Sequence, residues 1–118
     1  MNTNKKLPVF HEDSHETLGF ILQDTAGWDA QTVFGYSISR AENREAAERI
    51  VQENGSEYLK GVWQYFDEDD RQWHACVIKK AYEHQVTVVR TNEMGYQEPD
   101  DYKTVIIEDP SETNLIKS

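Results

Sequence analysis

Only one segment of the chain carries apolar residues at helical spacing, and this limits the fold more than any other feature. Within it the apolar residues recur at intervals of three and four positions: Ala46, Ala47, Ile50 and Val51. Asn54-Gly55 follows and supplies a left-handed stop. Ser39 with Glu42 matches a capping box, in which each side chain satisfies a backbone N–H at a helix start. The sequence therefore predicts one helix, beginning at Ser39 and ending at Asn54-Gly55.

The remaining segments show the two-residue alternation of β-strands. Six runs have strand length and β-favouring composition: residues 18–23, 31–39, 61–67, 72–79, 86–91 and 103–107. The acidic stretch 68–71 has the length of a hairpin loop, and the polar stretch 92–102 is typical of a longer loop. The order ββαββββ predicts an α+β fold, in which one helix covers one face of an antiparallel sheet of about five or six strands.

The length of 118 residues fits a single domain spanning residues 1–118. Residues 1–16 lack periodicity and residues 111–118 follow Pro110, so we expect both ends to be irregular. The sequence has neither the apolar run of a secretory signal nor that of a membrane span. Cys76 is the only cysteine, which excludes an intrachain disulfide. These features predict a cytoplasmic protein, and we expect a monomer.

One motif suggests metal chemistry. His11-Glu12-Asp13-Ser14-His15 matches the zincin pattern H-E-x-x-H, in which two histidines on one helix face bind zinc and the glutamate acts as a general base. The polar residues around it argue against a buried helix, and His74 and His84 are third-ligand candidates only by residue type. We therefore expect a solvated, irregular segment here and no metal site.

Other catalytic patterns are weaker. Cys76 and His74 lie two positions apart on a predicted strand, which does not make an activated dyad, and a buried cysteine usually acts as a small apolar residue. The sequence contains no G-x-S-x-G, P-loop or dinucleotide fingerprint. Residues 67–70 lack the glycine and the bidentate glutamate of a calcium loop. We expect no catalytic residue and no cofactor, and therefore a protein that is not an enzyme.

The distribution of charge is the strongest functional signal. Twenty-two acidic residues stand against twelve Lys and Arg, a net charge of −10. This disfavours direct contact with nucleic acid or anionic membranes and favours a basic protein partner. The acids collect in predicted loops and chain ends, whereas Glu48 and Glu45 of the helix are spaced to pair with Arg44 and Arg49. The predicted partner-binding residues are Glu12, Asp13, Glu16, Asp67, Glu68, Asp69, Asp70, Glu98, Asp100, Asp101, Glu108 and Asp109.

The spacing of some acids resembles that of phosphates. Carboxylates two positions apart on one strand face, such as those of Asp67 and Asp69 or of Glu98 and Asp100, lie about 6.6 Å apart. This is close to the distance between successive phosphates along a nucleic-acid strand, so the loops are expected to present phosphate-like rows.

The size, the charge and four acidic runs together resemble the bacterial DNA-mimic proteins, in particular those that bind the histone-like nucleoid protein HU. The runs are Glu12-Asp13, Asp67-Glu68-Asp69-Asp70, Asp100-Asp101 and Glu108-Asp109. The resemblance implies a non-enzymatic monomer that competes with DNA for a basic, HU-like DNA-binding protein. Lys79, Lys80 and Arg90 depart from this pattern, because they make one stretch of the predicted sheet basic.

The alternative is an immunity or antitoxin protein that inhibits a basic nuclease toxin. Such a protein also attracts a basic partner through its acidic residues, and it adds a few aromatic or carboxylate hot spots in a tight interface. The sequence alone does not separate these two functions.

Overall fold

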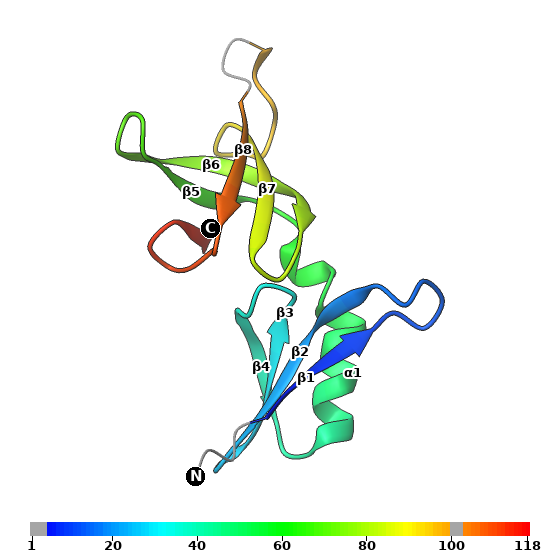
Figure 1. Ribbon diagram of the computed structural model, residues 1–118. Helices are drawn as coiled ribbons and strands as arrows, with labels where there is room; N and C mark the ends of the chain where they lie inside the picture. The colour runs from blue at the N-terminus through cyan, green and yellow to red at the C-terminus, as the bar shows by residue number, and fades with distance from the viewer. Residues whose placement is uncertain (1–4, 100–102) are drawn as a thin grey trace. The chain divides into compact units, whose positions relative to one another are not determined.

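The computed structural model describes residues 5–99 and 103–118, and within them the chain forms nine strands, one α-helix and a short 3-10 helix, Glu57–Leu59 (Figure 1). The predicted α+β class with a single covering helix is confirmed. The strands are divided between two antiparallel sheets, one of four strands and one of five, and not gathered in one sheet as predicted. The chain separates into two compact units, Met1–Leu59 and Lys60–Ser118, each with its own sheet.

The N-terminal unit is a meander covered by the helix. Its strands are β1 (Lys5–Phe10), β2 (Thr17–Asp24), β3 (Gly27–Thr32) and β4 (Ser37–Ala41), which lie in the order β1-β2-β3-β4. The helix α1 (Arg44–Asn54) packs on one face of this sheet, and the 3-10 helix η1 (Glu57–Leu59) follows it. The core between sheet and helix consists of the buried residues Val9, Ile21, Ala30, Ala47 and Val51.

A glycine allows this close packing. A Cβ atom added to Gly19 of β2 would lie 2.1 Å from the carbonyl oxygen of Gln31 and 2.9 Å from Cγ1 of Val51. Both distances are too short for real atoms, so only glycine lets β2 approach both β3 and α1 here.

Three boundaries in this unit differ from the predictions. Residues 5–10 form a strand within the segment expected to be irregular, because they pair with β2 over its length. The predicted strand 31–39 is interrupted by a turn at residues 33–36, in which Thr32 N–H donates to Tyr36 C=O (2.8 Å). The helix begins after Asn43, whose Oδ1 accepts the N–H of Ala46 (2.9 Å), because Ser39 pairs with Ala30 in the sheet.

The C-terminal unit is a second meander with a returning strand. Its strands are β5 (Trp63–Asp67), β6 (Gln72–Ala81), β7 (Gln85–Arg90), β8 (Thr104–Glu108) and β9 (Leu115–Lys117). They lie in the order β8-β7-β6-β5-β9, so β8 and β9 are the two sheet edges. The predicted hairpin of residues 61–79 is confirmed. The core of this unit contains fully buried residues from four strands, β5, β6, β7 and β9: Trp63, Tyr65, Cys76, Val86, Val88 and Leu115.

The C-terminal tail is part of this fold, and not irregular as predicted. Leu115 is fully buried, and its strand β9 pairs with β5 at Tyr65. A turn at residues 111–114 aims the chain back to the sheet, since Leu115 N–H donates to Ser111 C=O (2.8 Å) and Asn114 Oδ1 accepts the N–H of Ser111 (2.8 Å). A three-residue strand gives too little alternation to be seen in the sequence.

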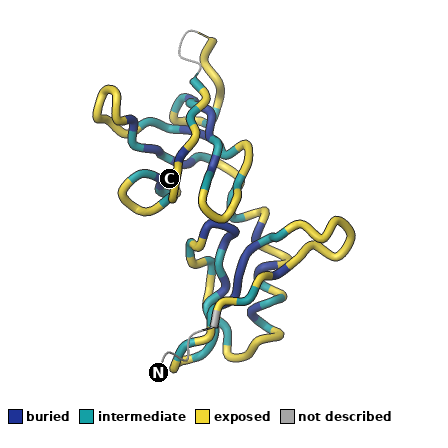
Figure 2. Tube along the Cα trace, viewed as in Figure 1, coloured by how far each residue is buried: buried dark blue, intermediate teal, exposed yellow. Residues whose placement is uncertain are grey.

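Figure 2 shows where the chain is exposed: the loop between β1 and β2 and the turn between β5 and β6 are exposed, while the centres of the strands are buried. Within the described residues the one α-helix has 11 residues, and no helix there is long and apolar enough to cross a membrane.

Candidate functional site

The hairpin of β5 and β6 ends in an acidic turn that its own side chains build. Asp67 Oδ1 accepts the N–H of Asp69 (2.8 Å), and Asp70 Oδ1 accepts the N–H of Gln72 (3.0 Å). Arg71 N–H donates to the carbonyl of Asp67 (2.7 Å) while Arg71 adopts a left-handed φ of 59°. Aspartate favours such turns because its short carboxylate reaches the N–H two residues ahead. Two of the four acids therefore shape the backbone.

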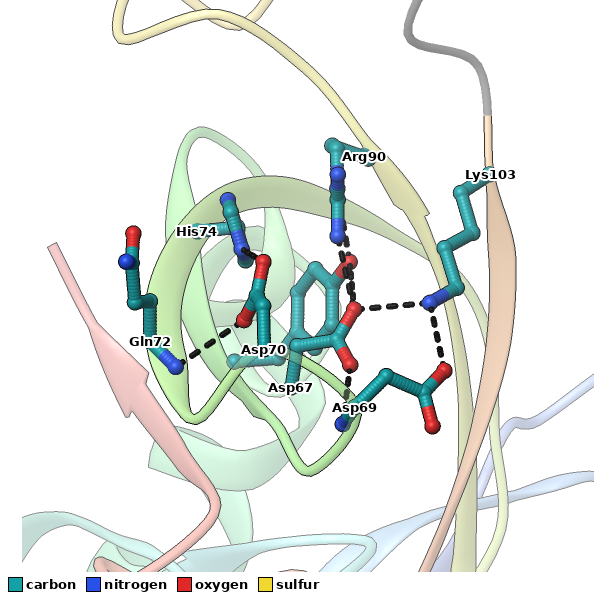
Figure 3. Close-up of polar contacts among 8 residues, drawn as sticks. Asp67, Asp69, Asp70, Gln72, His74, Arg90 and Lys103 are labelled. Carbon is teal, nitrogen blue, oxygen red and sulfur yellow. Dashed lines mark hydrogen bonds and ion pairs between the residues drawn. The ribbon is translucent and has the colours of Figure 1, made fainter.

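Asp67 lies inside the unit, with only 5% of its surface exposed. Its Oδ2 accepts hydrogen bonds from Arg90 Nη2 on β7 and from Lys103 Nζ, each at 2.7 Å (Figure 3). Arg90 Nε also donates to the hydroxyl oxygen of Tyr65 (2.8 Å), and Lys103 Nζ also donates to Asp69 Oδ2 (3.2 Å). One buried carboxylate is thus bound to two cations that come later in the sequence, one on β7 and one just before β8.

The two cations hold Asp67 in its charged form. The hydrogen bond from Lys103 and then the N–H of Asp69 lower the pKa of Asp67 from 3.8 to about 2. In return, the hydrogen bonds to Asp67 and Asp69 raise the pKa of Lys103, and burial raises the pKa of Tyr65. Asp67 is an internal counter-ion, so it does not fit the exposed, phosphate-like role predicted for it beside Asp69.

Asp70 extends this ion network toward the surface. Its Oδ2 lies 2.6 Å from Nε2 of His74, which stands on β6 (Figure 3). Asp67, Asp70 and His74 offer potential ligand atoms within 4.8 Å of one another. Because Asp67 is already bound to Arg90 and Lys103, a metal ion there would face two positive charges. The carboxylates of Asp67 and Asp70 are therefore already held by partners within this unit.

Beside this network the C-terminal unit has an open groove with a volume of about 500 Å³. It is lined by residues 65–69, which are the end of β5 and the start of the turn after it, by Lys103 and the whole of β8, and by Asn114. Glu108 lies at the far end of β8, so the groove lining contains four of the predicted partner-binding acids: Asp67, Glu68, Asp69 and Glu108. Lys103, bound to Asp67 and Asp69, is the basic residue in this lining.

The loop between β1 and β2 presents a different set of acids. Glu12, Asp13 and Glu16 are exposed, as predicted for partner-binding residues. The histidine-containing motif here forms a turn and not a helix: Nδ1 of His11 accepts the N–H groups of Asp13 (3.1 Å) and Ser14 (3.3 Å). The helical spacing that a zincin site needs is therefore missing.

The remaining predicted acids lie in the loop after β7 and at the end of β8. Glu98 is exposed and accepts a hydrogen bond from Asn92 Nδ2 (2.9 Å). Asp109 has an oxygen 3.6 Å from Nδ1 of His84. Asp100 and Asp101 lie outside the described residues.

Two further sequence expectations concern the helix and the cysteine. Arg44 and Glu48 form the expected pair (2.7 Å), but Glu45 and Arg49 do not pair. Cys76 is buried, and its burial raises the pKa of the thiol to about 12, which keeps it protonated and unreactive near neutral pH.

Sequence reasoning missed the cations that organise this site. The sequence places Arg90 with Lys79 and Lys80 in a basic stretch of the predicted sheet, whereas in the structure its guanidinium lies inward against Asp67 and Tyr65. Its alternation with Val86 and Val88, which are buried on the same strand, is the signal that places it on the inner face. Nothing in the sequence pairs Lys103 with an acid 36 positions earlier.

No protein-family model, no curated protein and no solved structure matches this chain, so the site is interpreted from its own geometry.

Proposed function

We propose that this protein is a non-enzymatic, acidic binding protein that occupies the basic DNA-binding surface of a partner, with an HU-like nucleoid protein as the first candidate. One observation supports this proposal above the others. The buried acid Asp67 is neutralised by Arg90 and Lys103. The tip acids Glu12, Asp13, Glu16 and Glu68 are exposed, and within the described residues none of them pairs with Lys or Arg.

Exposed, unpaired carboxylates on the turns of a sheet attract a basic surface without first breaking an internal ion pair. Their field raises the rate of encounter by roughly 10–10³-fold, and salt screens it over about 8 Å at physiological ionic strength. DNA binds its proteins through the same cations. An acidic protein held on those cations therefore excludes DNA.

Displacement of DNA is the direct test. Labelled duplex DNA bound to a purified HU-like protein is titrated with this protein, and fluorescence anisotropy is followed between about 50 and 200 mM salt. We expect DNA release that weakens steeply as salt rises. Binding that is salt-dependent but never displaces DNA would refute the mimic function, and binding that is flat across salt would show that the acids serve solubility only.

Matched variants locate the binding surface. Glu68→Gln with Asp69→Asn removes two charges from the hairpin turn, and Glu45→Gln with Glu53→Gln removes two from the exposed face of α1. We expect the turn variant to lower affinity about tenfold or more. The helix variant should lower it far less, and equal losses would mean that only net charge matters.

A second function, inhibition of a basic nuclease toxin, is supported by exposed large side chains beside acids. Met94 is 76% exposed and Tyr96 is also exposed in the loop that carries Glu98, and exposed Trp73 packs edge-on against Phe66. Anchors of this kind give tight protein interfaces. Three results together would favour inhibition over mimicry. A nuclease is recovered bound to this protein, this protein still blocks the nuclease activity at high salt, and the Tyr96→Ala variant of this protein no longer binds the nuclease.

A further inference from the structure

The strand β8 is an open edge of the C-terminal sheet. It pairs with β7 on one side, and no other strand in the described part of the chain pairs with its second side (Figure 1). All five residues of β8 also line the groove of about 500 Å³, together with residues 65–69 of β5 and the turn after it. The strand β8 is therefore both an open sheet edge and part of the groove lining.

The hydrogen bonds at the two ends of the ladder between β7 and β8 show which backbone groups of β8 face away from β7. Arg90 N–H donates to Lys103 C=O (2.8 Å), and Asp109 N–H donates to His84 C=O (2.7 Å). Residues in an antiparallel pair bond their partner strand at alternate positions. Residues 105 and 107 therefore bond β7, and the N–H and C=O groups of Ile106 and Glu108 point away from β7, to the open side of the strand.

This edge lacks the protection that the other sheet edges have. Lysine, arginine or proline on an edge strand discourages pairing with another chain. The N-terminal sheet has Lys6 and Pro8 on β1 and Arg40 on β4, and the other edge of the C-terminal sheet has Lys117 on β9. The strand β8, of sequence TVIIE, has none of these, and Ile106 on it is 58% exposed.

The charges around the groove select its occupant. Glu68, Asp69 and Glu108 line the groove, whereas Asp67 is already neutralised by Arg90 and Lys103. Lys103, which also bonds Asp69 (3.2 Å), is the one basic residue in the lining, so the lining remains acidic. These acids favour an incoming chain that carries Lys or Arg. A second copy of this chain is disfavoured, because two molecules of net charge −10 repel each other.

We propose that β8 binds an extended segment containing Lys or Arg from the basic partner, which adds to the sheet as a further antiparallel or parallel strand. Its backbone bonds Ile106 and Glu108, an apolar side chain contacts Ile106, and its cations face Glu68, Asp69 and Glu108. Strand addition of this kind takes its affinity from main-chain hydrogen bonds and its selectivity from alternate side chains. The proposal extends the proposed function, because it names the form in which a basic partner is held.

The test uses a synthetic peptide of about nine residues in which Lys and Val alternate, matching the two-residue period of a strand. Binding to the full-length protein is measured by NMR titration, and amide hydrogen exchange is followed residue by residue. We expect slower exchange at the amides of Ile106 and Glu108 on binding. N-methylation of alternate peptide residues should abolish binding in one register and leave it intact in the other.

Two variants complete the test. Ile106→Lys places a like charge at the edge and should weaken peptide binding about tenfold or more, whereas Tyr82→Lys adds the same charge at an exposed site outside the groove and should change it little. Circular dichroism and urea unfolding check that both variants fold. Equal affinity of the two variants, or protection of amides outside β8, would overturn the proposal.

The outcomes separate this proposal from the proposed function. Peptide binding at β8 without displacement of DNA from an HU-like protein would refute the mimic function and leave the strand-addition site standing. Displacement of DNA that Ile106→Lys does not alter, with no peptide protection at β8, would refute the strand-addition site alone. A dimer in light scattering that Ile106→Lys dissociates would show that β8 pairs with a second copy, which also overturns the proposal.

Discussion

The two acidic hairpin turns of this protein look alike in sequence but differ in structure. In the loop between β1 and β2, Glu12, Asp13 and Glu16 all face solvent, and the backbone is held by the ring of His11. In the turn between β5 and β6, Asp67 faces inward and is bound by two cations that follow it by 23 and 36 positions. Acid density therefore identifies a turn, while distant cations decide which acids remain available for a partner.

The largest expected difference between the two turns is in stability. Asp67→Asn keeps the shape of the side chain but removes the charge that balances Arg90 and Lys103. Leaving a buried cation without its partner typically costs about 3 kcal/mol, so we expect a loss of that size in the free energy of unfolding, measured by urea titration. Glu12→Gln in the other turn serves as the control and should change little. A loss below about 0.5 kcal/mol for Asp67→Asn would contradict the assignment of an internal counter-ion.

Acid pH should reveal the same difference. The pKa of Asp67 is lowered from 3.8 to about 2 by Lys103 and by the N–H of Asp69. A carboxyl whose folded pKa lies below its unfolded value stabilises the fold fully above the unfolded pKa, and this contribution is lost as the pH falls toward the folded one. The stability gap between the natural protein and Asp67→Asn should therefore be constant above about pH 5 and close between about pH 4 and 2. A gap that persists at about pH 2 would show that shape, and not charge, makes the difference.

How far the fold could be predicted depended on the range of the interactions involved. The hairpin of β5 and β6 and the stripe of α1 are set by neighbouring residues, and both were predicted. The division into two sheets could not be predicted, because the alternation of apolar residues along a strand shows which face is buried. It does not show which strands pair with one another. The helix start was misplaced because Ser39 has a capping sequence but pairs with Ala30, which leaves the cap to Asn43.

The site shows the same limit. The charge runs correctly located turns with exposed acids, as at Glu12 and Glu68. They did not show that Asp67 is internal, because its partners are Arg90 on β7 and Lys103 just before β8. The groove beside β8 was also missed, since an open edge is a property of strand order, which depends on pairing between distant segments.

The smallest expected effect is in the loop between β1 and β2. Glu12→Gln with Asp13→Asn removes two adjacent like charges, and within the described residues neither acid pairs with a cation. We expect the free energy of unfolding to stay within about 0.5 kcal/mol of that of the natural protein, with any change a gain, because only repulsion is removed. His11→Ala is the matched control, since it removes an acceptor for two backbone N–H groups and should cost about 0.5–1 kcal/mol. Urea titration at about pH 7 measures the free energy of unfolding of both variants, and the two losses are then compared. If the double variant loses more than the histidine variant, these acids stabilise the fold as Asp67 does, and the contrast between the two turns does not hold.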